Sequence, residues 1–374
     1  MARHYLDHAS TSPLRPEAAD AIRAWLTSPA GDPGRVHAEG RAVRAAVEEA
    51  REQVAALVGV RPRQVVFTSG GTEAVHAAVW SAAWDRPGGA VACADVEHSS
   101  VREASARLAR LVPIAVDGRG RIDPESLTAA LRDQHTALVH CQWANHEVGT
   151  LQPVADVVAR SQAAGAPVHA DAAAAAGHVP ITLAGDDAPD FLSVSAHKLG
   201  GPPGVGALVL RRGLRVEPLF VGSAQERGRR AGMENVPGIV GFGAAAAAAA
   251  AAATLEQEAS RAATERLART VLQTPGTVQV GDPTDRVPHI VCFGVEGVEA
   301  EPVLLGLDRA GIAAHSGSAC SSESLEPSPV LAAMGADPSH SLRLSTGWST
   351  TAEDVDAFAA VFGRVVSELR ALSG

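Results

Sequence analysis

The segment 193–206 holds the side chains of this chain that are best suited to covalent chemistry. A short apolar run, 191–194, is typical of a strand, and it leads into Ser195-Ala196-His197-Lys198 and then into a loop rich in glycine and proline. A lysine at the mouth of a strand, beside a hydroxyl and an imidazole, is well placed to form a Schiff base. The alternative is an ordinary surface lysine in a turn between a strand and a helix.

A second candidate is Asp171, which follows the short apolar run 168–170 and precedes five alanines. A buried carboxylate is costly unless it is paired with a cation. Pyridoxal phosphate offers such a cation in its pyridinium nitrogen, and the enzymes that use it pair this nitrogen with an aspartate and hold the aldehyde on a lysine. Asp171 and Lys198 together therefore predict a pyridoxal phosphate site, although Asp171 could instead cap a helix.

A candidate phosphate site follows the strand predicted at 64–68. The small residues Ser69-Gly70-Gly71-Thr72 lead directly into a helical run that continues to Trp84. The first backbone N–H groups of a helix have no partner within the helix, so they favour an anion such as phosphate. The alternative is a plain helix cap, which Thr72 could also provide.

One of the four cysteines has the surroundings of a reactive thiol. Cys320 lies in 315–328, a run of small polar residues, which predicts an exposed and mobile loop, whereas Cys93, Cys141 and Cys292 have apolar neighbours. An accessible thiol in such a loop can act as a nucleophile once it is deprotonated. The alternative is an incidental surface cysteine. No C-x-x-C pairing is present, so we expect reduced thiols and no metal site.

Arg343 lies in a predicted strand, 341–344, close to the C-terminal end of the chain. Its planar guanidinium could bind a substrate carboxylate with two hydrogen bonds. An arginine on a strand can equally be a surface residue or part of an ion pair.

The elements that must position these residues alternate between strands and helices. Alternation of this kind predicts an α/β fold with a mainly parallel sheet, in which ligands bind at the carboxyl ends of the strands. Polar groups follow several of these strands, at 97–98, 145–147, 171 and 195–198, and a common site explains all of them. The predicted strands are 64–68, 90–93, 112–116, 137–142, 168–170, 191–194 and 207–210.

The pattern changes after the ten alanines 244–253, a tract that favours a helix rather than a membrane span. A charged amphipathic helix, 256–272, and a smaller α+β segment with strands at 277–280, 289–293 and 341–344 follow. We therefore expect a large cofactor-binding domain, 15–253, and a small domain made of 1–14 and 254–374 that carries the Cys320 loop.

Composition narrows the class of protein. The 374 residues carry a formal net charge of −10, which argues against a general binder of nucleic acid or of anionic membranes. The first residues lack the apolar core of a signal peptide, and no stretch predicts a membrane span. We expect a soluble cytoplasmic protein with no direct contact to nucleic acid or membrane.

Taken together, the motifs resemble those of the cysteine desulfurases, in the class V aminotransferase group of fold type I pyridoxal phosphate enzymes. The Ser-Gly-Ser-Ala-Cys form followed by Leu-Glu-Pro-Ser is similar to the long-loop branch of that family. The matching segments are 5–9, 67–73, 96–98, 145–150, 169–173, 195–198, 225–228 and 316–320. The resemblance implies a large domain with a sheet of the seven-stranded type and a smaller α+β C-terminal domain.

The resemblance also implies roles. Lys198 would carry the cofactor as a Schiff base and later move a proton, Asp171 would pair with the pyridine nitrogen, and His98 would stack on the ring. Arg343 and Asn145 would bind L-cysteine, and the Cys320 thiolate would take its sulfur as a persulfide, releasing alanine. Sulfur-acceptor proteins would collect the sulfur, and the enzyme would be a homodimer whose sites the partner subunit completes. The residues implied for the cofactor are Lys198, Asp171, His98, Gly71, Thr72, Ser195, His197 and His146.

Three positions depart from the family pattern. His146 replaces an asparagine near the cofactor ring, Ala174 replaces a glutamine that binds the phenolic oxygen, and Met233 replaces a threonine that reaches the neighbouring subunit's phosphate. Each lost hydrogen bond costs about 0.5–1.5 kcal/mol net. We therefore expect weaker cofactor retention or altered electronics, with His146 able to replace one donor.

Other functions are compatible with the same motifs. The chain could be a repurposed relative, such as a selenocysteine or cysteine-conjugate C–S lyase or an epimerase, or a degenerate scaffold for sulfur relay. A lyase that releases a free product does not need the Cys320 thiol. The joint presence of Lys198, Asp171, His98 and Cys320 weighs against a scaffold.

Overall fold

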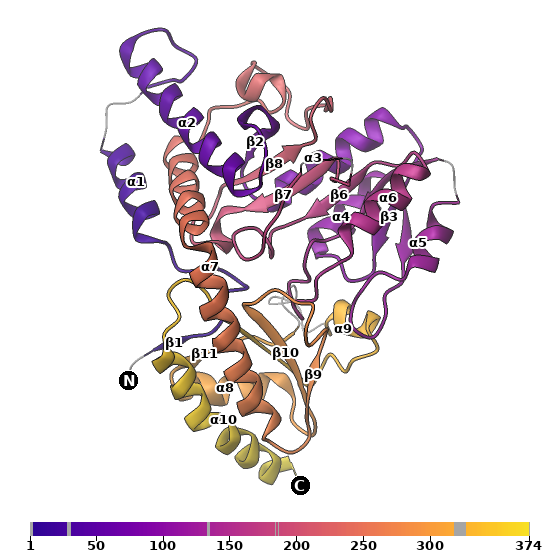
Figure 1. Ribbon diagram of the computed structural model, residues 1–374, viewed down its shortest axis with the longest axis vertical. Coiled ribbons are helices and arrows are strands. Elements are labelled where there is room, and N and C mark those ends of the chain that lie inside the picture. The colour runs from indigo at the N-terminus through magenta and orange to yellow at the C-terminus, as the bar shows by residue number, and fades with distance from the viewer. Residues whose placement is uncertain are drawn as a thin grey trace.

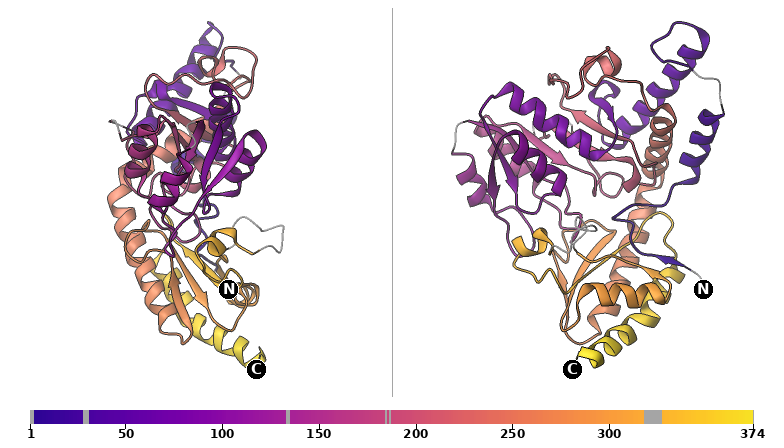
Figure 2. Two further views of the ribbon diagram at one scale, coloured as in Figure 1. Left: turned by 90° about the vertical axis from the view of Figure 1, so that its right-hand side faces the viewer. Right: turned by 180° about the vertical axis from the view of Figure 1, so that it is seen from behind.

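The computed structural model describes residues 3–27, 31–132, 135–183, 185, 187–317 and 327–373. These residues form a larger α/β unit and a smaller α+β unit, and the long helix α7 (Val236–Leu272) runs along both (Figure 1). Seen from the side, α7 lies along one edge of the molecule (Figure 2). Both ends of the chain lie at the smaller unit (Figure 1).

The larger unit is built on a seven-stranded sheet with the strand order β2-β8-β7-β6-β5-β3-β4. The neighbours from β7 through β4 are parallel, whereas β8 runs antiparallel to both β2 and β7. Most positions of these strands are buried on both faces, as a mainly parallel sheet requires. The strands are β2 (Val65–Thr68), β3 (Ala90–Ala94), β4 (Arg110–Ile114), β5 (Thr136–His140), β6 (Val168–Asp171), β7 (Phe191–Ser195) and β8 (Gly206–Leu210).

Helices cover both faces of this sheet. On one face α3 (Gly71–Asp85) and α4 (Ser99–Leu108) pack against β-strand residues such as Leu138 and Phe191. On the other face α2 (Ala38–Leu57), α6 (Val154–Ala163) and α7 enclose the rest of the core. The outer helices α1 (Pro16–Leu26) and α5 (Pro124–Ala130) complete the larger unit.

The smaller unit contains an antiparallel sheet with the order β12-β10-β9 and a two-stranded parallel sheet, β1-β11. Its core includes Phe293, Phe358 and Phe362, and the last two rings stack with their centroids 5.1 Å apart. Its elements are β1 (His4–Tyr5), β9 (Thr277–Val280), β10 (Ile290–Val295), α8 (Ala300–Arg309), β11 (Ile312–Ala313), α9 (Pro329–Ala333), β12 (Ser341–Ser345) and α10 (Ala352–Ser373).

The fold confirms the expected α/β class and mainly parallel seven-stranded sheet, and it differs from the sequence prediction in two elements. The N-terminal arm, for which no strand is predicted above, forms β1 and pairs with β11 of the smaller unit. The two helices predicted at 244–253 and 256–272 are one helix, α7, because no residue between them breaks the helix. The predicted domain boundary at 253 therefore falls inside α7.

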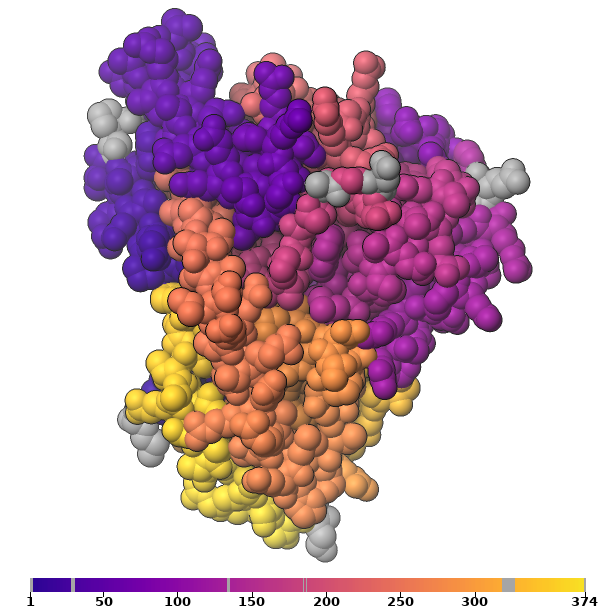
Figure 3. All heavy atoms as spheres, in the orientation of Figure 1, coloured from indigo at the N-terminus to yellow at the C-terminus, as the bar shows by residue number. Residues whose placement is uncertain are grey.

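By length and composition α7 could cross a membrane, a test that the core helix of a soluble protein also passes. Its N-terminal part contacts α1 and α2, and its C-terminal part packs into the core of the smaller unit. The space-filling view shows α7 running along the surface from the larger unit to the smaller one (Figure 3).

Candidate active site

A cavity of about 440 Å³ lies at the carboxyl ends of the parallel strands, beside the start of α3 and of α4. Its walls come from segments that are far apart in the chain. Eight of the residues predicted from the sequence line it: Gly71, Thr72, His98, His146, Asp171, Ser195, His197 and Lys198. The sheet thus gathers the predicted cofactor residues around one space.

At one end of the cavity, β2 leads into the N-terminus of α3, as expected for a phosphate site. The Ser195 hydroxyl lies 2.9 Å from Nδ1 of His197, beside this turn. Burial lowers the pKa of His197 to about 4, so at neutral pH this imidazole is uncharged and acts only through hydrogen bonds. Gly206 allows β8 to approach the turn, because a Cβ there would lie 2.7 Å from the carbonyl carbon of Gly70.

At the other end, the Asp171 carboxylate is held from two sides. Its Oδ1 accepts a hydrogen bond of 2.8 Å from the Ser193 hydroxyl and one of 3.0 Å from the Ala173 backbone N–H. Ser193 lies directly opposite Asp171 in the β6–β7 ladder. The strand register therefore orients the carboxylate that would pair with a pyridinium nitrogen.

A second carboxyl group, Glu97, lies near Asp171 and is fully buried. Its Oε1 accepts a 2.5 Å hydrogen bond from the Gln142 backbone N–H, and its Oε2 has no partner among the described residues. Burial, together with the charge of Asp171, raises the pKa of Glu97 to about 8. Glu97 is therefore a neutral acid at pH 7.

Two of the imidazoles that line the cavity contact each other. The rings of His98 and His146 meet edge to face with their centroids 5.1 Å apart. His98 also caps α4, because its Nδ1 accepts a hydrogen bond of 3.1 Å from the Ser100 N–H. His98 is thus fixed at the helix start, and His146, the first departure from the family pattern, lines the same cavity.

Lys198 ends the short 3-10 helix Ala196–Lys198, which directly follows β7. Its amine donates hydrogen bonds to the carbonyl oxygens of Ala9 and Ser10, at 2.5 and 3.0 Å. The N-terminal arm therefore reaches the cavity and holds the lysine at its edge.

Arg343 and Asn145, the two residues predicted to bind substrate, are not among the residues that line the cavity. Arg343 is 1% exposed, and its guanidinium donates to Asp7 Oδ1 (2.8 Å), to the Ser10 hydroxyl (2.6 Å) and to the His146 carbonyl (2.9 Å). A substrate carboxylate would have to compete with Asp7 for the Arg343 guanidinium.

Asn145 is fully buried, and its Oδ1 accepts hydrogen bonds from the backbone N–H groups of Glu147 and Val148. The roles of Arg343 and Asn145 toward substrate stay predictions.

Cys320 lies outside the described residues. On its C-terminal side, the Ser328 hydroxyl donates a 2.6 Å hydrogen bond to Glu147. On its N-terminal side, the Gly317 N–H donates a 3.0 Å hydrogen bond to the Ser341 hydroxyl. The other cysteines are free and buried, as expected, and burial raises the pKa of each of their thiols, that of Cys292 to about 12.

The remaining two departures from the family pattern lie in different surroundings. Ala174 lines the cavity with a methyl group where a hydrogen-bonding side chain is usual. Met233 is 59% exposed and lies outside this cavity.

Several polar groups around the cavity were not singled out from the sequence. Ser193, which orients Asp171, and Gln142, which lines the cavity, belong to or directly follow buried strands. Only the pairing of β6 with β7 identifies Ser193 as the partner of Asp171. The ion pair between Glu73 and Arg230, behind the phosphate end, joins residues 157 positions apart.

The residues around the cavity fit pyridoxal phosphate. A helix N-terminus with two hydroxyl side chains suits its phosphate, the oriented Asp171 carboxylate suits a protonated ring nitrogen, and Lys198 supplies the amine. His98 and His146 supply flat groups beside the place of a ring. The donor set therefore agrees with the cofactor predicted from the sequence.

Comparison with known proteins places the whole chain in one family. Residues 4–358 match the family described as aminotransferase class-V. The chain is 42% identical to a cysteine desulfurase of Cereibacter sphaeroides, over 100% of this chain and 98% of that protein. It is similar in structure to a NifS-like protein from Rickettsia africae, with a TM-score of 0.88 and 27% identity over 98% of this chain and 99% of that one. It is also similar to SspA in complex with cysteine, with a TM-score of 0.81 and 26% identity over 92% of this chain and 99% of that one. The chain belongs to the class-V aminotransferase family, among its cysteine desulfurases.

Proposed function

We propose that this protein is a pyridoxal phosphate-dependent cysteine desulfurase that converts L-cysteine to L-alanine and passes the sulfur to acceptor proteins. One observation carries the proposal: Asp171, oriented by Ser193, and the Lys198 amine line a single cavity together with a helix N-terminus. The identity to a cysteine desulfurase over the full chain and the likeness to a structure that holds cysteine support L-cysteine as the substrate.

The chain's own residues have distinct tasks in this reaction. Pyridoxal phosphate, when bound, supplies an electron-withdrawing ring that makes the bonds at the substrate α-carbon labile. Gly71, Thr72, Ser195 and His197 would hold its phosphate, and Asp171 would keep its nitrogen protonated. Lys198 would bind its aldehyde and then, as a free amine, move a proton at the substrate α-carbon.

The sulfur transfer itself needs a thiolate. The sulfur of Cys320 would bond to the substrate sulfur while the bond from that sulfur to the β-carbon breaks. The carbon side keeps the electron pair and takes up a proton, so alanine leaves and a persulfide remains on Cys320. The buried Cys93, Cys141 and Cys292 stay protonated at neutral pH and are closed to this role.

The deciding experiment combines a spectrum with product assays. Wild-type protein with pyridoxal phosphate and L-cysteine should form alanine and, with a reductant, sulfide. Lys198→Ala should lose the visible band of the bound cofactor, and Cys320→Ser should keep the band and lose sulfide. The neighbouring Ser321→Ala serves as the control and should behave as wild type. Sulfide release by Cys320→Ser would show a C–S lyase instead, and a wild type with neither band nor alanine would refute the proposal.

The protein is also proposed to be a cytoplasmic homodimer without direct contact to membrane or nucleic acid. Its free, buried thiols suit a reducing compartment, and its net charge of −10 disfavours nucleic acid. Leu26, Val36, Val221 and Met233 are 59–84% exposed, and a subunit interface would cover apolar side chains of this kind. Sedimentation equilibrium of the cofactor-loaded protein tests the dimer, because a mass near 38.3 kDa would contradict it.

A further inference from the structure

The phosphate end of the cavity, where β2 leads into α3, has negative charge nearby that would oppose the binding of a phosphate group. Two carboxylates, Glu73 and Asp171, line the cavity, and among the described lining residues Lys198 is the one amine. His197, the imidazole at that end, is neutral at pH 7. A phosphate monoester carries roughly −1.5 to −2 charges at this pH. Placed at the N-terminus of α3, it would meet the negative charge of Glu73, which belongs to the first turn of the same helix.

Arg230 lies behind Glu73 and faces it with its guanidinium. Nε lies 2.9 Å from Glu73 Oε1, and one terminal nitrogen lies 3.2 Å from Oε2. Oε2 also accepts a 2.7 Å hydrogen bond from the Ser69 N–H, in the turn before α3. The Glu73 side chain is 7% exposed and that of Arg230 is 25% exposed, so solvent screens the pair only partly.

The protonation states agree with an ion pair. Burial alone would raise the pKa of Glu73, but hydrogen bonds from Arg230 and Ser69 lower it overall. The hydrogen bonds to Glu73 raise the pKa of Arg230. Both groups are therefore charged at neutral pH.

The loop that carries Arg230 is held in place at some conformational cost. Glu226 and Arg227 have φ angles of 47° and 60°, a region that residues other than glycine seldom adopt. Glu226 is buried, where it accepts two hydrogen bonds from Arg51, at 2.6 and 2.7 Å, and one of 3.0 Å from the Phe67 N–H in β2. The loop is thus fastened to the same strand that leads into α3.

We propose that Arg230 is a positioning residue that neutralises Glu73 and thereby allows the N-terminus of α3 to accept the phosphate group of the cofactor. The proposal rests on the proposed cofactor and deepens it. Arg230 acts through Glu73, which belongs to the cavity wall, whereas Arg230 itself does not line the cavity.

The alternative is that Arg230 only fastens its loop, and a comparison of two ligands separates the two roles. Pyridoxal phosphate and pyridoxal share the ring and the aldehyde that reacts with Lys198, and they differ in the phosphate. Absorbance titrations of the apoprotein give the dissociation constant of each. We expect Arg230→Gln to weaken pyridoxal phosphate about tenfold and pyridoxal by less than about twofold, because only the phosphate meets the uncovered charge of Glu73.

A double variant sharpens the test. Gln at position 73 can still accept the Ser69 N–H but carries no charge, so Glu73→Gln/Arg230→Gln should recover the affinity for pyridoxal phosphate to within about threefold of wild type. Arg230→Lys keeps the charge and should stay near wild type. The control is Arg227→Gln in the same loop, whose partner Glu48 is 41% exposed, and it should change neither affinity.

Two results would overturn the proposal. One is an equal loss for pyridoxal phosphate and pyridoxal in Arg230→Gln, and the other is a double variant that binds as poorly as Arg230→Gln alone. If Arg230→Gln does not fold, the comparison of Glu73→Gln with wild type decides, because the single variant should bind pyridoxal phosphate at least as tightly. Failure of the desulfurase proposal would look different: wild type would form no alanine from L-cysteine, whatever the two ligands show.

Discussion

At the scale of single residues, the two carboxyl groups Asp171 and Glu97 differ in their hydrogen-bond partners and in their surroundings. Asp171 accepts hydrogen bonds from the Ser193 hydroxyl and from the Ala173 backbone N–H. Glu97 receives one backbone hydrogen bond, and it is buried close to the charge of Asp171, so it keeps its proton. Environment rather than residue type thus sets the protonation state of Glu97.

This difference predicts how stability depends on pH. The pKa of Glu97 is about 8 in the folded protein and 4.5 as its ordinary value, so the folded protein binds more protons between these values. The contribution of Glu97 to stability is therefore complete below pH 4.5 and is lost as the pH rises through 8. Glu97→Gln, which mimics the neutral acid, should gain stability relative to wild type between pH 5 and pH 9, by about 2 kcal/mol or more.

Urea unfolding of both proteins at the two pH values measures this gain. Glu103→Gln, on the exposed side of α4, is the control and should show no such change. A constant difference between Glu97→Gln and wild type across the range would contradict the neutral state of Glu97.

A buried hydrogen bond between Ser328 and Glu147 lies on the C-terminal side of the segment that carries Cys320. Ser328 is fully buried and donates to Glu147, itself 1% exposed, whose other oxygen has no hydrogen-bond partner among the described residues. Ser328→Ala would remove both the hydroxyl partner of Glu147 and the acceptor of the Leu331 N–H at the start of α9, at a cost of about 1–3 kcal/mol. Chemical denaturation should show this loss, and Glu147→Gln/Ser328→Ala should recover part of it. A Ser328→Ala protein as stable as wild type would show that the contact contributes nothing.

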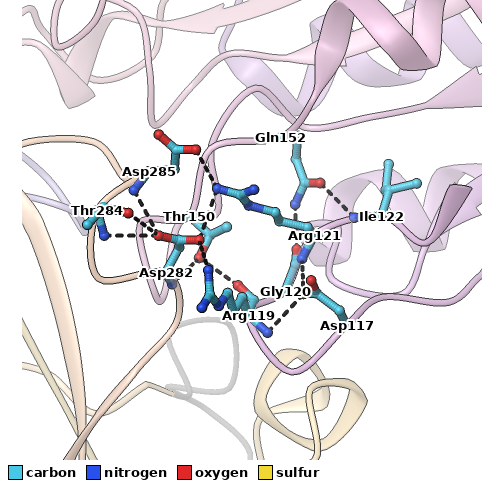
Figure 4. Close-up of polar contacts among 10 residues, drawn as sticks. All are labelled: Asp117, Arg119, Gly120, Arg121, Ile122, Thr150, Gln152, Asp282, Thr284 and Asp285. Atoms are coloured by element: carbon cyan, nitrogen blue, oxygen red, sulfur yellow. Dashed lines mark hydrogen bonds and ion pairs between the residues drawn. The ribbon is translucent and has the colours of Figure 1, made fainter.

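At the scale of elements, a network of hydrogen bonds and ion pairs centred on Asp282 connects the two units (Figure 4). Asp282 precedes β10 in the smaller unit, and its carboxylate accepts the N–H groups of Thr284 and Asp285 at 2.9 and 2.8 Å. Its other oxygen pairs with Arg119 and Arg121, from a turn of the larger unit, at 3.3 and 2.9 Å. Burial alone would raise the pKa of Asp282, but the hydrogen bonds from Asp285 and Thr284 and the charge of Arg121 lower it to about 2.

The same network extends through Thr150 to the loop that carries His146. The Thr150 hydroxyl donates to the Arg119 carbonyl at 2.7 Å and accepts from the Asp282 N–H at 2.9 Å. The Thr150 carbonyl accepts from the Asn145 N–H at 2.9 Å. A single aspartate is thus linked through Thr150 to one wall of the cavity.

Asp282→Ala should therefore lower the free energy of unfolding by about 2–3 kcal/mol, because several hydrogen bonds to a buried charge are lost together. Asp285→Ala is the matched control: its side chain is 68% exposed and shares Arg121, so its loss should be within about 0.5 kcal/mol. Thermal unfolding of both variants measures the difference. Equal losses of unfolding free energy in the two variants would show that Asp282 contributes no more than Asp285, the exposed partner of Arg121.

At the scale of the whole molecule, three histidines lie where the N-terminal arm and the two units meet, two of them buried (His8 and His289) and one half-buried (His178). His178 of the larger unit and His289, just before β10, stack with their ring centroids 3.6 Å apart. His8 of the arm lies 2.8 Å from the Ser12 hydroxyl and 3.2 Å from that of Thr350. Burial lowers the pKa of His8 and of His178 to about 4, and that of His289 well below its ordinary value.

These neutral histidines predict acid sensitivity of the junction. The unfolded chain binds protons at its histidines near pH 6.5, whereas the folded protein resists protonation of His8 and His178 down to about pH 4. Their contribution to stability is thus complete above pH 6.5 and is lost as the pH falls toward 4. His8→Gln, which cannot be protonated, should reduce the loss of stability between pH 7 and pH 5. Thermal unfolding at both values measures this, and an unchanged slope would remove His8 from the explanation.

The sequence alone determined those parts of the site that are local in the chain. The strand that ends at Asp171, the Ser195-Ala196-His197-Lys198 turn and the start of α3 at Gly71 each follow from patterns within a few residues. The α/β class also followed, because strand and helix periodicities differ and alternate along the chain.

Only the tertiary structure decided which distant groups meet. The register of β6 against β7 gives Asp171 its serine, the folding of the N-terminal arm gives Arg343 its partner Asp7, and the loop after β8 brings Arg230 to Glu73. It also showed α7 as one helix and β1 as a strand of the smaller unit. Apart from the continuity of α7, these features depend on contacts between residues far apart in the chain. Such contacts leave no periodic trace in the sequence, because each is made by a single side chain or by a two-residue strand.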